Sequence, residues 1–126
     1  ETRLPLMFDA MMREGGLGPE MFARLTATAP AQTYGLTGKG ALSAGMDADI
    51  VIWDAGKSVT YGADDLHDNV GYNPWEGRTV TGWPVQVMLR GKTLCKGGAF
   101  HGTPGAGRWI DRPHLATRPT QYEEET

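Results

Sequence analysis

The hydrophobic period of the chain changes within residues 39–54, KGALSAGMDADIVIWD, and this change constrains the fold more than any other feature. Before the segment, apolar side chains recur every three or four residues, which is typical of amphipathic helices. After it, they alternate along short runs, which is typical of β-strands. The segment therefore predicts a boundary between a helical part and a sheet part.

Three helices are predicted before this boundary. The first covers residues 3–14, where leucine, phenylalanine and methionine fall at helical spacing. The second begins at Pro19 and ends at Pro30, because the residue before a proline is disfavoured in the α region. The third is short and covers residues 30–35. Each has one apolar stripe, so we expect all three to pack against a partner surface.

The boundary segment itself predicts a brief strand at residues 41–42, a turn at residues 45–47 and a strand over residues 49–54. Gly45 is the residue expected to have a positive φ in the turn. Apolar side chains lie on both faces of the strand, which predicts a strand that is central or covered on both sides. Asp47 and Asp49 flank an alanine, and we interpret both as turn-forming residues.

Several short strands are predicted after the boundary. The alternation is clearest over residues 85–90, which indicates a half-buried strand. We expect Gly91-Lys92 to form a type II′ hairpin loop, because glycine stands at its first position. The remaining expected strands are residues 57–61, 78–81, 93–96 and 99–100, with a loop over residues 69–77 and a turn at residues 97–98.

Composition and charge narrow the class of protein. A net charge of −3 gives no electrostatic reason to expect nucleic acid or an anionic membrane as a partner. One cysteine excludes an intrachain disulfide and any cysteine-rich metal site, and it suits a reducing compartment such as the cytoplasm. No apolar run approaches the roughly 20 residues that cross a bilayer.

One candidate acid–base cluster surrounds His67, which has Asp64, Asp65 and Asp68 close by in sequence. A solvated loop is the interpretation we favour there over a catalytic site. The histidines of the chain form no pair at metal-ligand spacing; they are His67, His101 and His114.

Two further features were weighed for chemistry. Cys95 lies on an expected hairpin strand with no histidine near it in sequence, so we interpret it as a structural thiol and not a nucleophile. The GTPGAG run at residues 102–107 superficially resembles a phosphate-binding loop. It lacks the Gly-Lys-Ser/Thr ending and a helical pattern after it, so we discard that function.

Residues 39–54 resemble the segment by which chains of the amidohydrolase superfamily leave a barrel and return to a small sandwich. The resemblance lies in a Lys-Gly, a small-residue turn, then Asp-Ala-Asp and an apolar strand. Residues 1–8, 25–40, 66–92 and 105–110 are similar to the corresponding segments of hydantoinases and dihydropyrimidinases. The resemblance covers residues 1 to about 113, most of the chain.

The resemblance implies an α/β fold, a (β/α)₈ barrel with a small β-sandwich. Residues 1–37 are then the last helices of the barrel domain, and residues 38–101 the C-terminal share of the sandwich. Residues 102–126 form a tail that contacts an oligomer partner before becoming disordered. The chain also opens without an initiator methionine, so we expect a C-terminal piece of a longer protein. One departure from the family pattern is Ala29, where those enzymes often carry asparagine.

The resemblance also implies an activity, the hydrolysis of a cyclic amide. Two zinc ions, bridged by a carboxylated lysine and hydroxide, polarise the ring carbonyl and supply the nucleophile. The family's His-x-His, lysine, histidine and aspartate ligands do not occur in this sequence, and we expect them upstream of Glu1 together with a substrate-contacting asparagine. We therefore assign no catalytic, cofactor-binding or metal residue to the chain. A small cyclic amide and a homotetramer are the implied partners.

Three alternatives stay open at this point. The chain is also compatible with a non-enzymatic, dihydropyrimidinase-related scaffold protein or with an allantoinase. An independent β-rich binding domain is the third alternative, and it predicts that the 126 residues fold cooperatively alone. We expect instead that they do not, and that the isolated chain binds no stoichiometric zinc.

Overall fold

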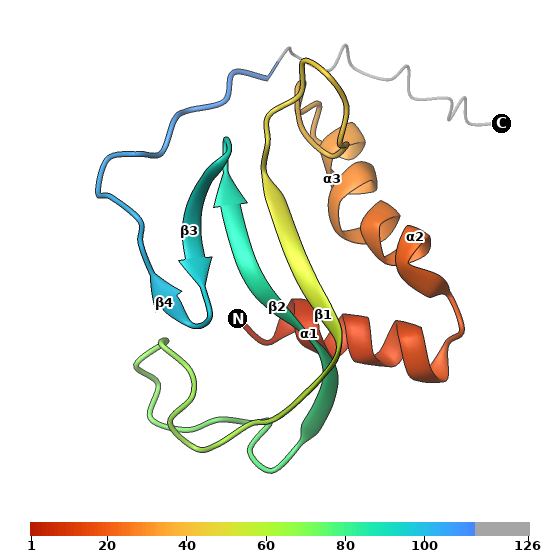
Figure 1. The fold of residues 1–126 in the computed structure, drawn as a ribbon, viewed down its shortest axis with the longest axis vertical. Helices are drawn as coiled ribbons and strands as arrows, with labels where there is room; N and C mark the ends of the chain where they lie inside the picture. Colours follow the sequence, from red (N-terminus) through yellow and green to blue (C-terminus); the bar gives the residue numbers. More distant parts are fainter. Residues whose placement is uncertain (113–126) are drawn as a thin grey trace, which may run out of the picture.

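A computed structural model describes residues 1–112, which form a helical layer and one antiparallel sheet (Figure 1). The strands lie in the order β1-β2-β3-β4. The helical segments lie along the β1 side of the sheet, and α1 meets β2. In chain order the elements are α1 (Arg3–Asp9), the π-helical turn η1 (Ala10–Glu14), α2 (Gly18–Ala23), the π-helical turn η2 (Arg24–Thr28), α3 (Ala29–Thr33), β1 (Ile50–Thr60), β2 (Thr79–Leu89), β3 (Lys92–Lys96) and β4 (Ala99–Phe100).

The change of period at residues 39–54 is confirmed as a structural boundary, because the helices all precede it and the strands all begin within it or after it. The first helix also has its predicted extent, with α1 running directly into η1. Its end differs from an ordinary α-helical end. The N–H of Gly15 donates to the carbonyl of Ala10, five residues earlier, at 2.9 Å. This wider turn closes the helix before the chain reverses at Gly16, which has φ +56°.

The prediction that Pro30 ends the second helix is wrong. The helix continues through η2 into α3, of which Pro30 is the second residue. The π-helical turn makes this possible, since the N–H of Ala29 reaches back to the carbonyl of Arg24. The helical hydrogen bonds therefore span five residues instead of four in the turn just before the proline.

The strands are longer than predicted. Residues 49–54 and 57–61 were expected to form two strands, but β1 runs through both, with a change of register between Asp54 and Ser58. A carboxylate oxygen of Asp54 accepts hydrogen bonds from the N–H groups of Gly56 (3.0 Å) and Lys57 (3.1 Å), so the irregular residues keep their backbone donors satisfied. The strands predicted at residues 78–81 and 85–90 are likewise parts of a single strand, β2, which covers Thr79–Leu89 and leaves Arg78 and Arg90 outside.

Two predictions for the boundary segment are also wrong. Residues 41–42 form no strand: Ala41 lies in a bend next to Gly40, which has φ +83°. Within the described residues β1 pairs only with β2 and is an edge strand, and its Val51 and Ile52 are 39% and 45% exposed. The turn was predicted correctly, since the N–H of Met46 donates to the carbonyl of Ser43 and Gly45 has φ +88°.

The hairpin between β2 and β3 differs by one residue from the prediction. Leu89 pairs with Lys92, so the loop is Arg90-Gly91 and not Gly91-Lys92. Both loop residues have positive φ, +47° and +77°, which makes a type I′ turn. Arg90 is held in this conformation because its N–H donates to the carboxylate of Asp49 at 2.8 Å. The turn predicted at residues 97–98 is confirmed.

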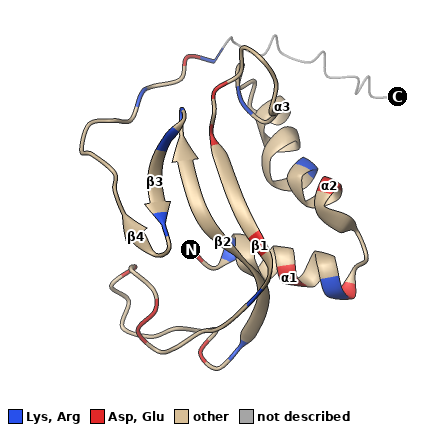
Figure 2. Ribbon diagram, in the orientation of Figure 1, with Lys and Arg blue, Asp and Glu red and all other residues tan. Residues whose placement is uncertain are grey.

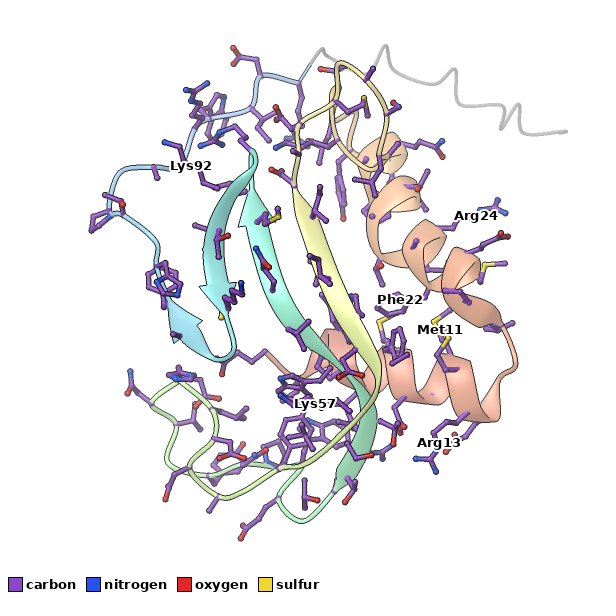
Figure 3. The ribbon with its side chains drawn as sticks, viewed as in Figure 1. Met11, Arg13, Phe22, Arg24, Lys57 and Lys92 are labelled. Atoms are coloured by element: carbon purple, nitrogen blue, oxygen red, sulfur yellow. The ribbon has the colours of Figure 1, made fainter. Side chains whose placement is uncertain are left out.

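An aromatic cluster joins the helical layer to the sheet. Asp49 precedes β1 and Asp54 lies within it, and the residues between them, 50–53, are uncharged (Figure 2). There the ring of Trp53 stacks on Phe8, with centroids 4.6 Å apart and planes 5° apart. Phe22 meets both rings edge-on, at 5.2 and 5.3 Å. Met11 completes the buried core, and Figure 3 shows Met11 and Phe22 pointing into the space between the helices and the sheet.

Two polar and backbone features fix the position of this cluster. The carboxylate of Asp9, 4% exposed, accepts hydrogen bonds from the N–H of Thr81 (2.9 Å) and from Arg13 (3.1 Å). Gly82 has φ +98°, and a Cβ atom there would lie 2.1 Å from the ring of Phe8. The strand therefore needs glycine where it passes over the helix.

Residues 102–112 continue beyond β4 without helix or strand. The disordered tail predicted from Pro113 onward lies outside the described residues.

Candidate functional site

His67, the candidate acid–base residue, pairs with Glu1 at the start of the chain. The imidazole Nδ1 of His67 lies 2.7 Å from a carboxylate oxygen of Glu1, and the backbone N–H of His67 donates to the other oxygen at 2.8 Å. That backbone hydrogen bond is the main reason why the pKa of Glu1 is lowered. The His67 side chain is 86% exposed, so the pair lies in solvent and joins a loop to the start of α1.

Two of the neighbouring carboxylates serve the loop backbone. Asp65 accepts a hydrogen bond from the N–H of Gly62 at 2.6 Å, and Asp68 accepts one from Val70 at 3.1 Å. Both contacts are short-range turn contacts. They support the solvated-loop interpretation of this region.

The same loop is organised from inside by Asn73, which is 6% exposed. Its amide group donates to the carbonyl of Gly62 at 2.8 Å, and its carbonyl oxygen accepts from the N–H of Trp75 at 2.9 Å. Tyr61, at the end of β1, is 3% exposed, and burial raises the pKa of its phenol. Neither side chain was singled out from the sequence, because only the folded loop buries them.

Cys95 occupies the middle of β3, half-buried, and pairs with Val87 on one side and Phe100 on the other. Its placement is that of a strand residue in a sheet, as the sequence indicated. The GTPGAG run at residues 102–107 is followed by no helix within the described residues.

A charged cluster holds the connecting segment, residues 34–49, which joins α3 to β1. The ammonium of Lys39 contacts the carboxylates of Asp47, at 2.7 Å, and of Asp49. Asp49 also accepts the backbone N–H of Arg90, and the Arg90 guanidinium donates to the carbonyl of Ala106. These contacts join the connecting segment, the β2–β3 hairpin and the segment after β4. We call the group of Lys39, Asp47, Asp49 and Arg90 the charged clip.

The pKa shifts in this charged clip follow from its contacts. The hydrogen bond to Asp47, and then the one to Asp49, raise the pKa of Lys39. Burial alone would raise the pKa of Asp49, but the hydrogen bonds from Lys39 and from the N–H of Arg90 outweigh it and lower that pKa. Each charge has an opposite charge or a backbone partner, so the cluster is built to hold segments together.

A hollow lies beside this clip. It is a cleft of about 440 Å³ between α3, the connecting segment, the hairpin and residues 107–110. Its lining includes the apolar side chains of Ala31, Leu36 and Leu89 and the charged residues Lys39 and Arg90. No nucleophile with an adjacent general base lines it, so the cleft carries no catalytic arrangement.

Within residues 1–112 no three or more of the histidine, cysteine, aspartate and glutamate side chains gather to hold a metal ion. The assignment of no catalytic, cofactor-binding or metal residue to the chain stays a prediction. The described part of the chain also contains no helix with the length and apolar character that a membrane crossing requires.

Comparison with solved structures shows the same fold in hydantoinases. A crystal structure of a D-hydantoinase matches with a TM-score of 0.81 and 33% identity, over 87% of this chain and 24% of that one. An L-hydantoinase (dihydropyrimidinase) from Arthrobacter aurescens matches with a TM-score of 0.80 and 31% identity, over 86% of this chain and 24% of that one.

Sequence comparison gives the same relatives. A D-phenylhydantoinase from Escherichia coli O81 (strain ED1a) is 41% identical over 113 residues, covering 89% of this chain and 24% of the relative. The chain thus spans about a quarter of the length of the curated relatives that it matches. The model of the amidohydrolase family matches residues 2–94. Since that match covers most of the sequence and includes both the helices and the sheet, the chain belongs to the amidohydrolase family.

Proposed function

We propose that the protein containing this chain hydrolyses the ring C–N bond of a cyclic amide of the hydantoin or dihydropyrimidine type. The observation that carries the proposal is the 41% identity with D-phenylhydantoinase over 89% of the chain. The similar solved structures are named as hydantoinases or dihydropyrimidinases, which supports both ring types. These names do not favour a non-enzymatic scaffold protein or an allantoinase.

The proposed cofactor is a pair of zinc ions. The described residues do not fit this group, because they bring together no cluster of possible ligands. The ligands are proposed to lie upstream of Glu1, and no step of the reaction is assigned to a side chain of this chain. Metal ions in such hydrolases polarise a carbonyl and generate a nucleophilic hydroxide.

Within the whole protein, residues 1–37 are proposed to belong to the barrel domain and residues 38–101 to the sandwich. The free edge of β1 supports this division. Along this edge, the backbone N–H and C=O groups that point away from β2 have no partner strand in the described residues. The side chains of Val51 and Ile52 on the same strand are partly exposed. A strand from outside this chain would pair with that edge and cover the apolar side chains.

The tail, residues 102–126, is proposed to contact another subunit of a homotetramer. Trp109 supports this, because its side chain is 88% exposed, and a large apolar surface of that kind is usually covered by a partner. The substitution Trp109→Ala in the whole protein should lower the mass measured by light scattering, while Tyr34→Ala, on another exposed aromatic, should not. An unchanged mass for the tail variant contradicts the contact.

A small cyclic amide is the proposed partner. Neither nucleic acid nor a membrane is proposed as a partner, because the net charge of −3 gives no attraction to their negative charges. A cytoplasmic location is proposed because a single cysteine, Cys95, allows no disulfide within the chain and so suits a reducing compartment.

The decisive experiment is a ring-opening assay on the purified whole protein. Hydantoin, dihydrouracil and allantoin are supplied separately, before and after removal of metal with a chelator and its return as zinc. We expect hydrolysis of hydantoin or dihydrouracil that disappears with the metal and returns with zinc. Absence of hydrolysis in the zinc-loaded protein would reject the proposed activity.

Metal analysis of residues 1–126 alone serves as the matched control. We expect no stoichiometric zinc in this chain under conditions in which the whole protein retains its metal. Tight, stoichiometric binding by the short chain would show that the ligands have been placed wrongly, whatever the outcome of the assay.

A further inference from the structure

We draw no further inference here: the strongest candidate, the cleft of about 440 Å³ between α3, the β2–β3 hairpin and residues 107–110, carries nothing because nothing in the structure shows what covers or occupies its largely apolar lining.

Discussion

Two contacts hold the connecting segment and the helices against the sheet, and they work by different physics. The aromatic cluster of Phe8, Phe22 and Trp53 is mostly buried and joins the helices to the middle of β1. The charged clip of Lys39, Asp47, Asp49 and Arg90 is partly exposed, with the carboxylates of Asp47 and Asp49 43% and 32% exposed. It lies at the end of β1 where the connecting segment enters. Buried apolar contacts gain free energy in proportion to the area removed from water, whereas exposed ion pairs gain little. The aromatic cluster therefore fixes the helices on the sheet, and the clip mainly sets the path of the chain.

The largest expected loss of stability follows from separating residues 1–126 from the rest of the protein. The aromatic cluster is small, and the free edge of β1 leaves Val51 and Ile52 exposed. We expect no sharp thermal unfolding transition in the isolated monomer, together with aggregation through the edge. Circular dichroism on heating, at several protein concentrations, measures this. A sharp and concentration-independent transition would mean that the cluster and clip suffice for folding.

Within the whole protein, Phe8→Ala should give the largest loss of any single substitution in these two contacts. It removes a ring stacked on Trp53 and leaves a cavity under Gly82, at a cost of about 3–5 kcal/mol. Urea unfolding followed by circular dichroism measures the free energy of unfolding. Leu25→Ala, on a side chain that is 47% exposed, is the control and should change it by less than about 1 kcal/mol.

Asp9→Ala should cause the next largest loss in the free energy of unfolding. The substitution leaves the N–H of Thr81 without its acceptor, at a cost of about 1–3 kcal/mol. Arg13→Ala is the matched control, because it removes only an ion pair whose cation is 58% exposed and should cost at most about 1 kcal/mol. Equal losses in the two variants would show that the ion pair, and not the backbone contact, carries the role of Asp9.

The charged clip should give the smallest effect, about 1 kcal/mol or less for Asp49→Asn. The pKa of Asp49 is lowered in the folded protein, so its contribution is present above the ordinary value of 3.8 and is lost as pH falls through the lowered pKa. The pKa of Lys39 is raised, so its contribution is present below 10.5 and is lost as pH rises through the raised pKa.

The free energies of unfolding of the wild-type protein and of Asp49→Asn are measured across the acid range, where Asp49 titrates, and the alkaline range, where Lys39 titrates. Their difference at each pH is the contribution of the Asp49 charge. The curves should converge at acid pH, where both proteins lack the aspartate charge. A constant difference at every pH would mean that Asp49 acts by shape and not by charge.

The sequence predicted the parts of the fold that depend on local periodicity. The first helix, the turn at Gly45 and the strand character of β2 and β3 follow from spacing and turn chemistry that neighbouring residues carry. The resemblance of residues 39–54 to amidohydrolases also predicted the family that the comparisons show. For the candidate site, local sequence predicted Asp47 and Asp49 as turn residues, whereas the structure pairs both carboxylates with Lys39.

By itself, then, the sequence determined the boundary between helices and sheet, the family, and the absence of the family's metal-ligand motifs from these 126 residues. The tertiary structure decided that the helix continues past Pro30, that Arg90 takes a left-handed conformation, and that Asp9 binds the backbone of β2. The last two depend on hydrogen bonds between residues about 40 and 70 positions apart, and the first on a wider helical turn that local propensity does not encode. The spacing of apolar residues along the chain does not predict such contacts, because they form only when distant segments meet.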